Sequence, residues 1–183
     1  MRKIVASLFI SLDGVVDAPD QWHLPYFDDE MGEAVGALMS DTMLYGRTTY
    51  EGFAEAWPQR EGTDDEDAEF AKILGDARKI VVSHGEVDLS WRNSEKLGGD
   101  LVTGVTALKK ESGGDVSIGG SISVIRQLLR HGLLDELHLL VHPIAVRRGE
   151  RLFDEGDSTI PLKLLTSKAF GSGVLHLVYG PAD

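Results

Sequence analysis

Apolar side chains predominate in three short segments of the first 120 residues and alternate with polar ones in a fourth, Asp115-Val-Ser-Ile118. Each segment is followed within a few positions by a glycine. Continuous apolar runs of this length are typical of strands that are buried on both faces of a parallel sheet. The pattern predicts strands at 3–10, 42–45, 79–83 and 115–118.

Apolar residues between these strands recur at helical spacing instead. Met31, Val35, Leu38 and Met39 show the period, and acidic residues precede them at the position that a helix dipole favours. Helices are predicted over 28–40, 48–56, 65–76, 102–111 and 121–131. Alternating strands and helices favour an α/β fold with a largely parallel sheet.

The last third of the chain returns to a strand pattern. Apolar and β-branched residues predict strands at about 135–142, 162–170 and 173–180, and a Gly171-Ser-Gly173 turn joins the last two. A terminal hairpin adds antiparallel strands, so the sheet is expected to be mixed. With 183 residues the chain is expected to form a single domain, 1–183.

Composition and charge exclude several classes of function. The chain carries 18 basic and 30 acidic residues, has no cysteine, and has no apolar run long enough for a membrane span. A net charge of −12 disfavours nucleic-acid and membrane partners. The N-terminal apolar segment is too short for a signal peptide, so a cytoplasmic location is expected.

An acidic segment at 61–69 holds six carboxylates in nine positions. A solvated loop leading into a helix is favoured over a cation site, because the spacing and central glycine of a calcium loop are absent. No metal is expected. His138 and His142 would lie about 13 Å apart on one strand face, too far to share an ion. With Glu136 they predict a polar or subunit-facing surface.

Three junctions at the carboxyl ends of strands carry groups suited to phosphate. Ile118-Gly-Gly-Ser121 and Tyr45-Gly-Arg-Thr-Thr49 each lead from a strand into a helix, and Val82-Ser-His84 ends a third strand. Glycines allow close backbone approach, Ser121 can cap its helix or bind phosphate, and Arg47 offers a planar guanidinium. Together they predict a ligand with several phosphates, a dinucleotide first. P-loop, G-x-G-x-x-G and G-x-S-x-G motifs are absent, and no nucleophile and base pair indicates a hydrolase or transferase.

These stretches, in this order, resemble the dihydrofolate reductase superfamily. Within it they are most similar to the reductase domain of the riboflavin-biosynthesis deaminase/reductase, the RibD C-terminal type, and its small stand-alone relatives. The resemblance includes Ser11-Leu-Asp-Gly14, Lys79-Ile-Val-Val-Ser83, Leu128–Leu137, Pro143 and Gly149-Glu-Arg-Leu-Phe153. It implies a three-layer α/β/α fold, NADPH-dependent hydride transfer to a C=N-type bond, and a homodimer. No zinc-binding deaminase domain precedes this one, so a bifunctional chain is not expected.

The resemblance also implies the cofactor contacts. Gly46, Arg47, Thr48 and Thr49 would contact the cofactor phosphates, Ser83 and His84 would lie near the adenosine end, and the pyrophosphate would lie on Gly119, Gly120, Ser121 and Ile122. The family usually carries a basic residue near position 84. A histidine there leaves the choice between NADPH and NADH open.

Two carboxylates are candidates for the catalytic site. Asp13 resembles the substrate-side aspartate of the riboflavin-pathway reductases, with a turn residue as the alternative. Asp28 follows a Trp-x-Leu-Pro stretch similar to that of dihydrofolate reductases but arrives one residue late, so a helix cap is an equal alternative.

The segment 15–27 bears on the substrate, because it offers no Lys or Arg for a ribose phosphate. Trp22, Tyr26 and Phe27 suggest a flat, uncharged heterocycle such as a pterin or amino-pyrimidine. We therefore expect a reductase similar in type to the 5-amino-6-(5-phosphoribosylamino)uracil reductase of riboflavin biosynthesis. Its substrate stays unassigned. The alternative is a dinucleotide-binding protein of the same fold without turnover.

Overall fold

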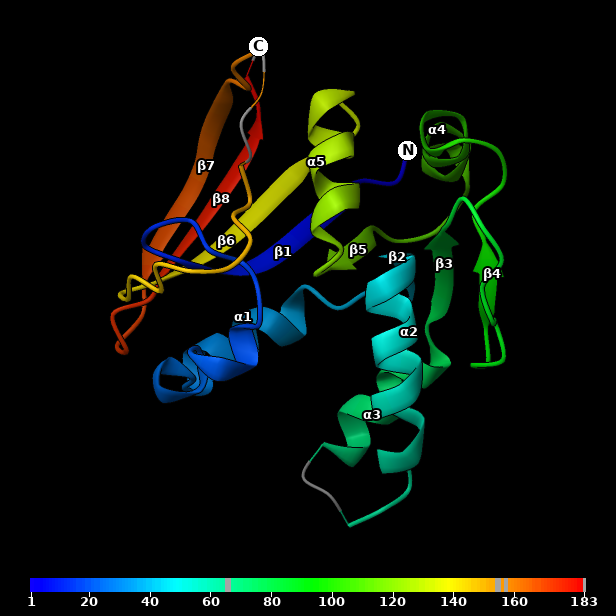
Figure 1. The fold of residues 1–183 in the computed structure, drawn as a ribbon, viewed down its shortest axis with the longest axis horizontal. Helices are drawn as coiled ribbons and strands as arrows, with labels where there is room; N and C mark the ends of the chain where they lie inside the picture. Colours follow the sequence, from blue (N-terminus) through cyan, green and yellow to red (C-terminus); the bar gives the residue numbers. More distant parts are fainter. Residues whose placement is uncertain (65–66, 154–155, 157, 183) are drawn as a thin grey trace.

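A computed structural model describes residues 1–64, 67–153, 156 and 158–182 (Figure 1). One eight-stranded sheet runs through these residues in the order β4-β3-β2-β5-β1-β6-β8-β7. Its strands are β1 (Ile4–Ser11), β2 (Thr42–Gly46), β3 (Arg78–Val82), β4 (Ser94–Lys96), β5 (Val116–Gly119), β6 (Glu136–His142), β7 (Leu162–Ala169) and β8 (Leu175–Pro181). All neighbours from β4 to β6 are parallel, whereas β8 is antiparallel to both β6 and β7.

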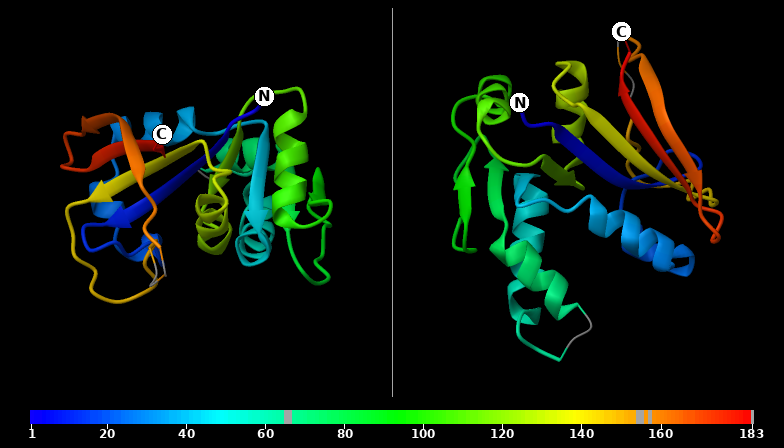
Figure 2. Two further views of the ribbon diagram at one scale, coloured as in Figure 1. Left: turned by 90° about the horizontal axis from the view of Figure 1, so that it is seen from above. Right: turned by 180° about the vertical axis from the view of Figure 1, so that it is seen from behind.

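Helices cover both faces of the sheet, which gives three layers. They are α1 (Asp29–Ala37), α2 (Arg47–Ala56), α3 (Ala68–Asp76), α4 (Leu101–Lys110) and α5 (Ile122–Arg130), with short 3-10 turns at Pro19–Gln21, Leu24–Tyr26 and Pro58–Arg60. In Figure 1, α4 and α5 lie above the sheet and α1 and α3 below it, and the right-hand view of Figure 2 shows the same layers from behind. No helix in the described ranges is both long and apolar enough to cross a lipid bilayer.

Three clusters of buried side chains hold the layers together. The largest joins α4 and α5 to one face of β1, β5 and β6 through residues such as Val105, Ile125 and Ile118. On the opposite face, Tyr50 and Leu74 attach α2 and α3 to β2 and β3, and Met31 attaches α1 to Leu140 of β6. The helix faces that the sequence marks as apolar are therefore the faces that pack on the sheet.

The direction of the crossovers positions the functional site. From β1 the chain moves through β2 to β3 with α1, α2 and α3 on one face, then returns to β5 and crosses to β6 with α4 and α5 on the other. At the carboxyl ends of β2 and β5 the chain therefore leaves toward opposite faces. Such a switch point opens a crevice in which α/β proteins bind ligands.

The predicted strands and helices are confirmed within a few residues, and the mixed sheet with its C-terminal hairpin is as expected. The helix predicted over 65–76 begins at Ala68, and residues 65 and 66 lie outside the described residues. Between the predicted strand at 79–83 and the predicted helix at 102–111, where no element was predicted, the structure contains β4. This three-residue edge strand, Ser94-Glu-Lys96, is largely exposed and carries no apolar pattern by which sequence could reveal it.

Candidate functional site

The glycine junctions after β2 and β5 are bound directly to each other. The amide nitrogen of Gly46 donates to Ser121 Oγ at 2.9 Å, and the amide nitrogen of Ser121 donates to Thr49 Oγ1 at 3.0 Å. Gly120 has a φ of +66°, and a Cβ there would lie 3.3 Å from the Thr49 side chain. Glycine is therefore required at position 120 both for the backbone turn and for the close approach of α2.

Ser121 has a different role from the helix cap considered for it. It adopts left-handed backbone angles before the first turn of α5, and its side chain makes no capping hydrogen bond. Its hydroxyl instead accepts the Gly46 amide, which frees the first N–H groups of α5 for other partners.

A cavity of about 640 Å³ opens at these two junctions. Its walls include the first turns of α2 and α5 and the end of β3. The lining residues are Val16, Asp17, Ala18, Gly46, Arg47, Thr48, Thr49, Val82, Ser83, His84, Gly85, Gly120, Ser121, Ile122, Ser123, Val124, Gln127 and Glu150. Nine of the ten residues predicted to contact the cofactor thus come together here, and Gly119 lies just beyond.

Arg47 brings positive charge to one end of this glycine-lined cavity. Its Nε donates to Glu51 Oε1 at 2.7 Å, with both side chains about half exposed, and its guanidinium lies beside Gly85. Ser83 Oγ also donates to the Gly85 carbonyl, at 3.0 Å. An exposed ion pair of this kind is weak and leaves the guanidinium available to an anion.

Lys96 is a basic residue near this end that sequence reasoning missed. Its Nζ donates to the Gly85 carbonyl at 3.0 Å. It lies eleven residues farther along the chain, on the unpredicted β4, so no local pattern could associate it with His84. Glu150, an acidic residue of the lining, was also missed, because it too lies far along the chain from the other lining residues. Arg126 pairs with Glu150 at 2.8 Å.

A second cavity, of about 350 Å³, adjoins the first. Both are lined by Val16 and Gly120. The remaining lining residues of this apolar cavity are Ser7, Leu8, Phe9, Pro19, Val35, Leu38, Met39, Met43, Tyr45, Phe53, Phe70, Leu74, Ser117, Gly119 and Leu140. It lies on the sheet face that α1, α2 and α3 cover.

Asp13 is committed to the backbone of another loop. Its carboxylate accepts hydrogen bonds from Ser11 Oγ at 2.6 Å and from the amides of Val146 and Arg147 at 3.0 and 2.8 Å. The Ser11 hydroxyl, followed by these amides, lowers the pKa of the Asp13 carboxyl. Asp13 therefore joins the turn after β1 to the segment after β6, and its role toward substrate stays a prediction.

Asp28 occupies the helix-cap position. Its carboxylate accepts the amide of Met31 at 2.9 Å at the start of α1, and this bond, together with contacts to Ser172, lowers its pKa. Neither cavity described above includes Asp28 in its lining.

The three aromatic residues predicted to contact substrate lie outside the apolar cavity. Trp22 and Tyr26 contact the ring of His142 edge-on, with centroids 5.2 and 5.7 Å apart, and Phe27 is half exposed. Their contact with a substrate stays a prediction.

The polar or subunit-facing surface predicted around His138 and His142 is wrong for this chain. His142 is fully buried, Nδ1 donates to the Leu140 carbonyl at 2.8 Å, and Nε2 has no hydrogen-bond partner among the residues that the structure describes. His138 is nearly buried between Glu136 and His176. The alternation of β6 was identified correctly, but Trp22, His23 and Tyr26 of the loop 19–27 pack over His142.

No group of three or more histidine, aspartate or glutamate side chains in the described ranges is arranged to hold a metal ion. In the acidic segment, Glu61 pairs with Arg92 and Asp67 with Arg60, while residues 65 and 66 lie outside the described residues.

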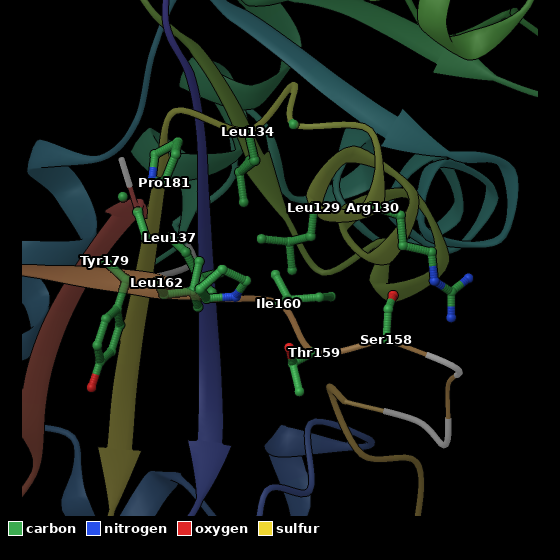
Figure 3. Close-up of a pocket in the computed structure, with 14 residues that line it drawn as sticks. Leu129, Arg130, Leu134, Leu137, Ser158, Thr159, Ile160, Leu162, Tyr179 and Pro181 are labelled. Atoms are coloured by element: carbon green, nitrogen blue, oxygen red, sulfur yellow. The ribbon is translucent and has the colours of Figure 1, made fainter.

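Another cavity, of about 300 Å³, lies at the opposite end of the parallel strands from the glycine junctions (Figure 3). It is bounded by the end of α5 and by β8, with Leu129, Ile160 and Tyr179 among its lining. Leu137 places it at the amino ends of the parallel strands, away from the crevice. None of the predicted site residues lines it.

Comparison with known proteins identifies the family. The model of the RibD C-terminal domain matches residues 2–176. The chain belongs to the RibD C-terminal domain family. This is a reductase family with a dihydrofolate reductase-like fold, and its reductases usually use a nicotinamide dinucleotide.

The chain is also similar to individual proteins. The chain is 29% identical over 181 residues to the uncharacterized protein YyaP of Bacillus subtilis, covering 97% of this chain and 94% of that one. A putative riboflavin biosynthesis protein from Shewanella shares the fold with a TM-score of 0.75 and 21% identity, over the full length of both chains. The Thermotoga maritima deaminase/reductase matches with a TM-score of 0.67 and 18% identity, over 99% of this chain and 57% of that one.

Proposed function

We propose that this RibD C-terminal protein is an NADPH-dependent reductase that transfers hydride to a C=N-type bond of a pterin-like or amino-pyrimidine acceptor. The observation that carries the proposal is the pair of adjoining cavities. One is lined by glycine junctions and an arginine, the other is apolar, and both meet at Gly120. A phosphate-bearing donor and a flat acceptor require this division of polar and apolar space.

The residues at the glycine-lined cavity fit a dinucleotide. Main-chain N–H groups at the starts of α2 and α5 are suited to phosphate oxygens, and Gly120 adds no side chain to the wall. Gly46, Arg47, Thr48 and Thr49 would hold phosphates on one side, and Gly119, Gly120, Ser121 and Ile122 would do so on the other. The bound nicotinamide would supply the hydride.

The adenosine end would lie by Ser83 and His84. There Arg47 and Lys96 both approach Gly85, which supplies two cations where the family usually has a basic residue. We therefore expect NADPH to bind more tightly than NADH, because the additional phosphate of NADPH would meet these cations.

A homodimer in the cytoplasm completes the proposal. β7 forms an edge of the sheet, and Leu164 and Leu165 on it are about half exposed. The outer edge of β7 offers free main-chain groups, and these exposed apolar side chains beside it would suit pairing with a second copy of the chain.

A dinucleotide-binding protein without turnover is the second candidate. It is favoured by the geometry of Asp13 and Asp28, since both carboxylates already accept main-chain N–H groups. If the protein does turn over, the proton for nitrogen would have to come from water or from a hydroxyl group. Turnover with any pterin or amino-pyrimidine separates the two candidates.

The first test is a titration of the protein with NADPH and NADH, followed by nicotinamide fluorescence. Saturable binding is expected, and Arg47→Ala should weaken NADPH binding by about 1.5 to 3 kcal/mol, the value of a charge-assisted phosphate contact. Glu51→Gln is the matched control. It removes the ion-pair partner of Arg47 but keeps the guanidinium, so affinity should be retained or increased. Failure of both nucleotides to bind would overturn the proposal.

A further inference from the structure

We propose that the apolar cavity selects an uncharged, hydrophobic aromatic ring and rejects ligands that carry an anionic group within it. This inference rests on the proposed function for its biological meaning, because it names the class of acceptor. The binding property itself can be tested without any nucleotide.

The walls of the cavity provide apolar surface from three directions. Phe9 and Met43 project from the sheet, Leu38 and Met39 come from the end of α1, and Phe70 comes from α3. All seventeen of its lining residues in the described part of the chain are uncharged. A volume of about 350 Å³ is in the range of sites for small organic ligands.

Three hydroxyl groups supply the polarity of this cavity, those of Ser7, Ser117 and Tyr45. Ser117 Oγ is already bonded to Ser40 Oγ at 3.0 Å. The Tyr45 hydroxyl donates to Met43 Sδ at 2.9 Å, and a thioether is a weak acceptor. A carbonyl oxygen or ring nitrogen of a ligand would be a better acceptor, so Tyr45 is the group most suited to orient an uncharged heteroatom.

The arginine side chains near this cavity do not line it. Arg47 lines the glycine-lined cavity, and Arg151 lies 3.9 Å from Asp13 and donates to its main-chain carbonyl. Arg147 and Arg148 follow β6 and do not line the apolar cavity. A phosphate or sulfonate placed among Phe9, Met39 and Phe70 would lose its water without gaining a cation, which is strongly unfavourable.

Two dyes that differ by one charge test this directly. N-phenyl-1-naphthylamine is uncharged, and 8-anilino-1-naphthalenesulfonate has the same ring system with a sulfonate. Fluorescence titration of the full chain without nucleotide should show one saturable site for the uncharged dye. The sulfonate should bind at least roughly tenfold more weakly.

A lysine placed in the cavity wall should reverse this preference. Met39 is only partly buried, so Met39→Lys adds a cation that can reach water while lining the cavity. It should weaken the uncharged dye and strengthen the sulfonate. Val102→Lys is the matched control, because Val102 is 39% exposed on α4, on the opposite face of the sheet. It adds the same charge and should leave both affinities unchanged.

Ser7→Phe provides an uncharged second variant in case Met39→Lys does not fold. It fills the cavity from β1 and should weaken the neutral dye. Equal affinity for the two dyes in the unmodified protein would overturn the inference, and so would binding that neither cavity variant changes. If the dyes are discriminated but NADPH does not bind, the proposed reductase function fails while the selective cavity stands.

Discussion

The carboxylate of Asp13 shows how one residue can connect distant parts of a site. It lies in the turn after β1, yet two of its hydrogen bonds come from amides more than 130 positions later, at Val146 and Arg147. These bonds hold the loop after β6 beside the segment that supplies Val16 to both cavities. Asp13 therefore acts on the site through the backbone, whatever it contributes to substrate binding.

Replacing Asp13 by asparagine should destabilise the protein at neutral pH. An amide nitrogen cannot accept the hydrogen bonds that the carboxylate accepts, and the native pKa of Asp13 lies below its ordinary value. A carboxyl group whose pKa is lower in the folded state stabilises that state at pH values above the pKa of the unfolded state. This stabilisation is lost as the pH falls through the pKa of the folded state. Thermal unfolding should therefore show a difference between Asp13→Asn and wild type at pH 7 that shrinks below about pH 4. A constant difference across this range would contradict the prediction.

At the scale of elements, the junction between α3 and β3 depends on a buried lysine. Lys79 Nζ donates to the carbonyls of Leu74, Gly75 and Ala77 at 2.7, 2.9 and 2.7 Å and lies 4.4 Å from the centre of the Trp91 ring. Carbonyls at the end of a helix have no partners within the helix. Lys79 thus caps α3 from within the sheet and holds the helix that carries part of the apolar cavity wall.

Lys79→Met should lower the free energy of unfolding by roughly 2–4 kcal/mol, because the Leu74 and Ala77 carbonyls lose the donor that Lys79 supplies, whereas the Gly75 carbonyl keeps Asn93 Nδ2. Urea denaturation measures this value. Lys72→Met is the control on the same helix, since Lys72 pairs with Asp76 on the exposed surface and its removal should change stability little. Equal effects of the two substitutions would show that the cap is unimportant.

For the whole molecule, buried histidines couple stability to pH. Burial lowers the pKa of His23, His142 and His176. Below an unfolded-state pKa of about 6.5, the unfolded chain binds protons that the folded chain does not. The free energy of unfolding should therefore fall as pH decreases from about 6.5, until the native histidines are protonated as well.

His142→Phe should reduce this acid sensitivity. Phenylalanine keeps a ring among the surrounding aromatic side chains but does not titrate, so the loss of stability between pH 7.5 and pH 5 should be smaller by up to about 1.4 kcal/mol per pH unit. Denaturant midpoints at the two pH values measure it. Comparing the pH difference within each protein removes the separate cost of losing the bond to Leu140. An unchanged difference would exclude His142 as the source.

The sequence by itself determined the α/β alternation, the C-terminal hairpin and half of the residues that line the glycine-lined cavity. Apolar period and turn residues are local properties, and β2 and β5 each lead into a glycine at the predicted position. Because carboxyl ends of parallel strands share one edge, residues as far apart as Gly46 and Ser121 could be expected to converge.

Only the tertiary structure decided which side chains share the space between these elements. It brings Lys96 to Gly85, commits Asp13 and Asp28 to main-chain amides, and buries His142 under the loop at 19–27. It also assembles the apolar cavity from three helices and four strands whose residues, taken singly, are ordinary core positions. Such contacts depend on how loops and helices that are far apart in the sequence pack together. The local pattern of apolar and polar residues does not determine that packing.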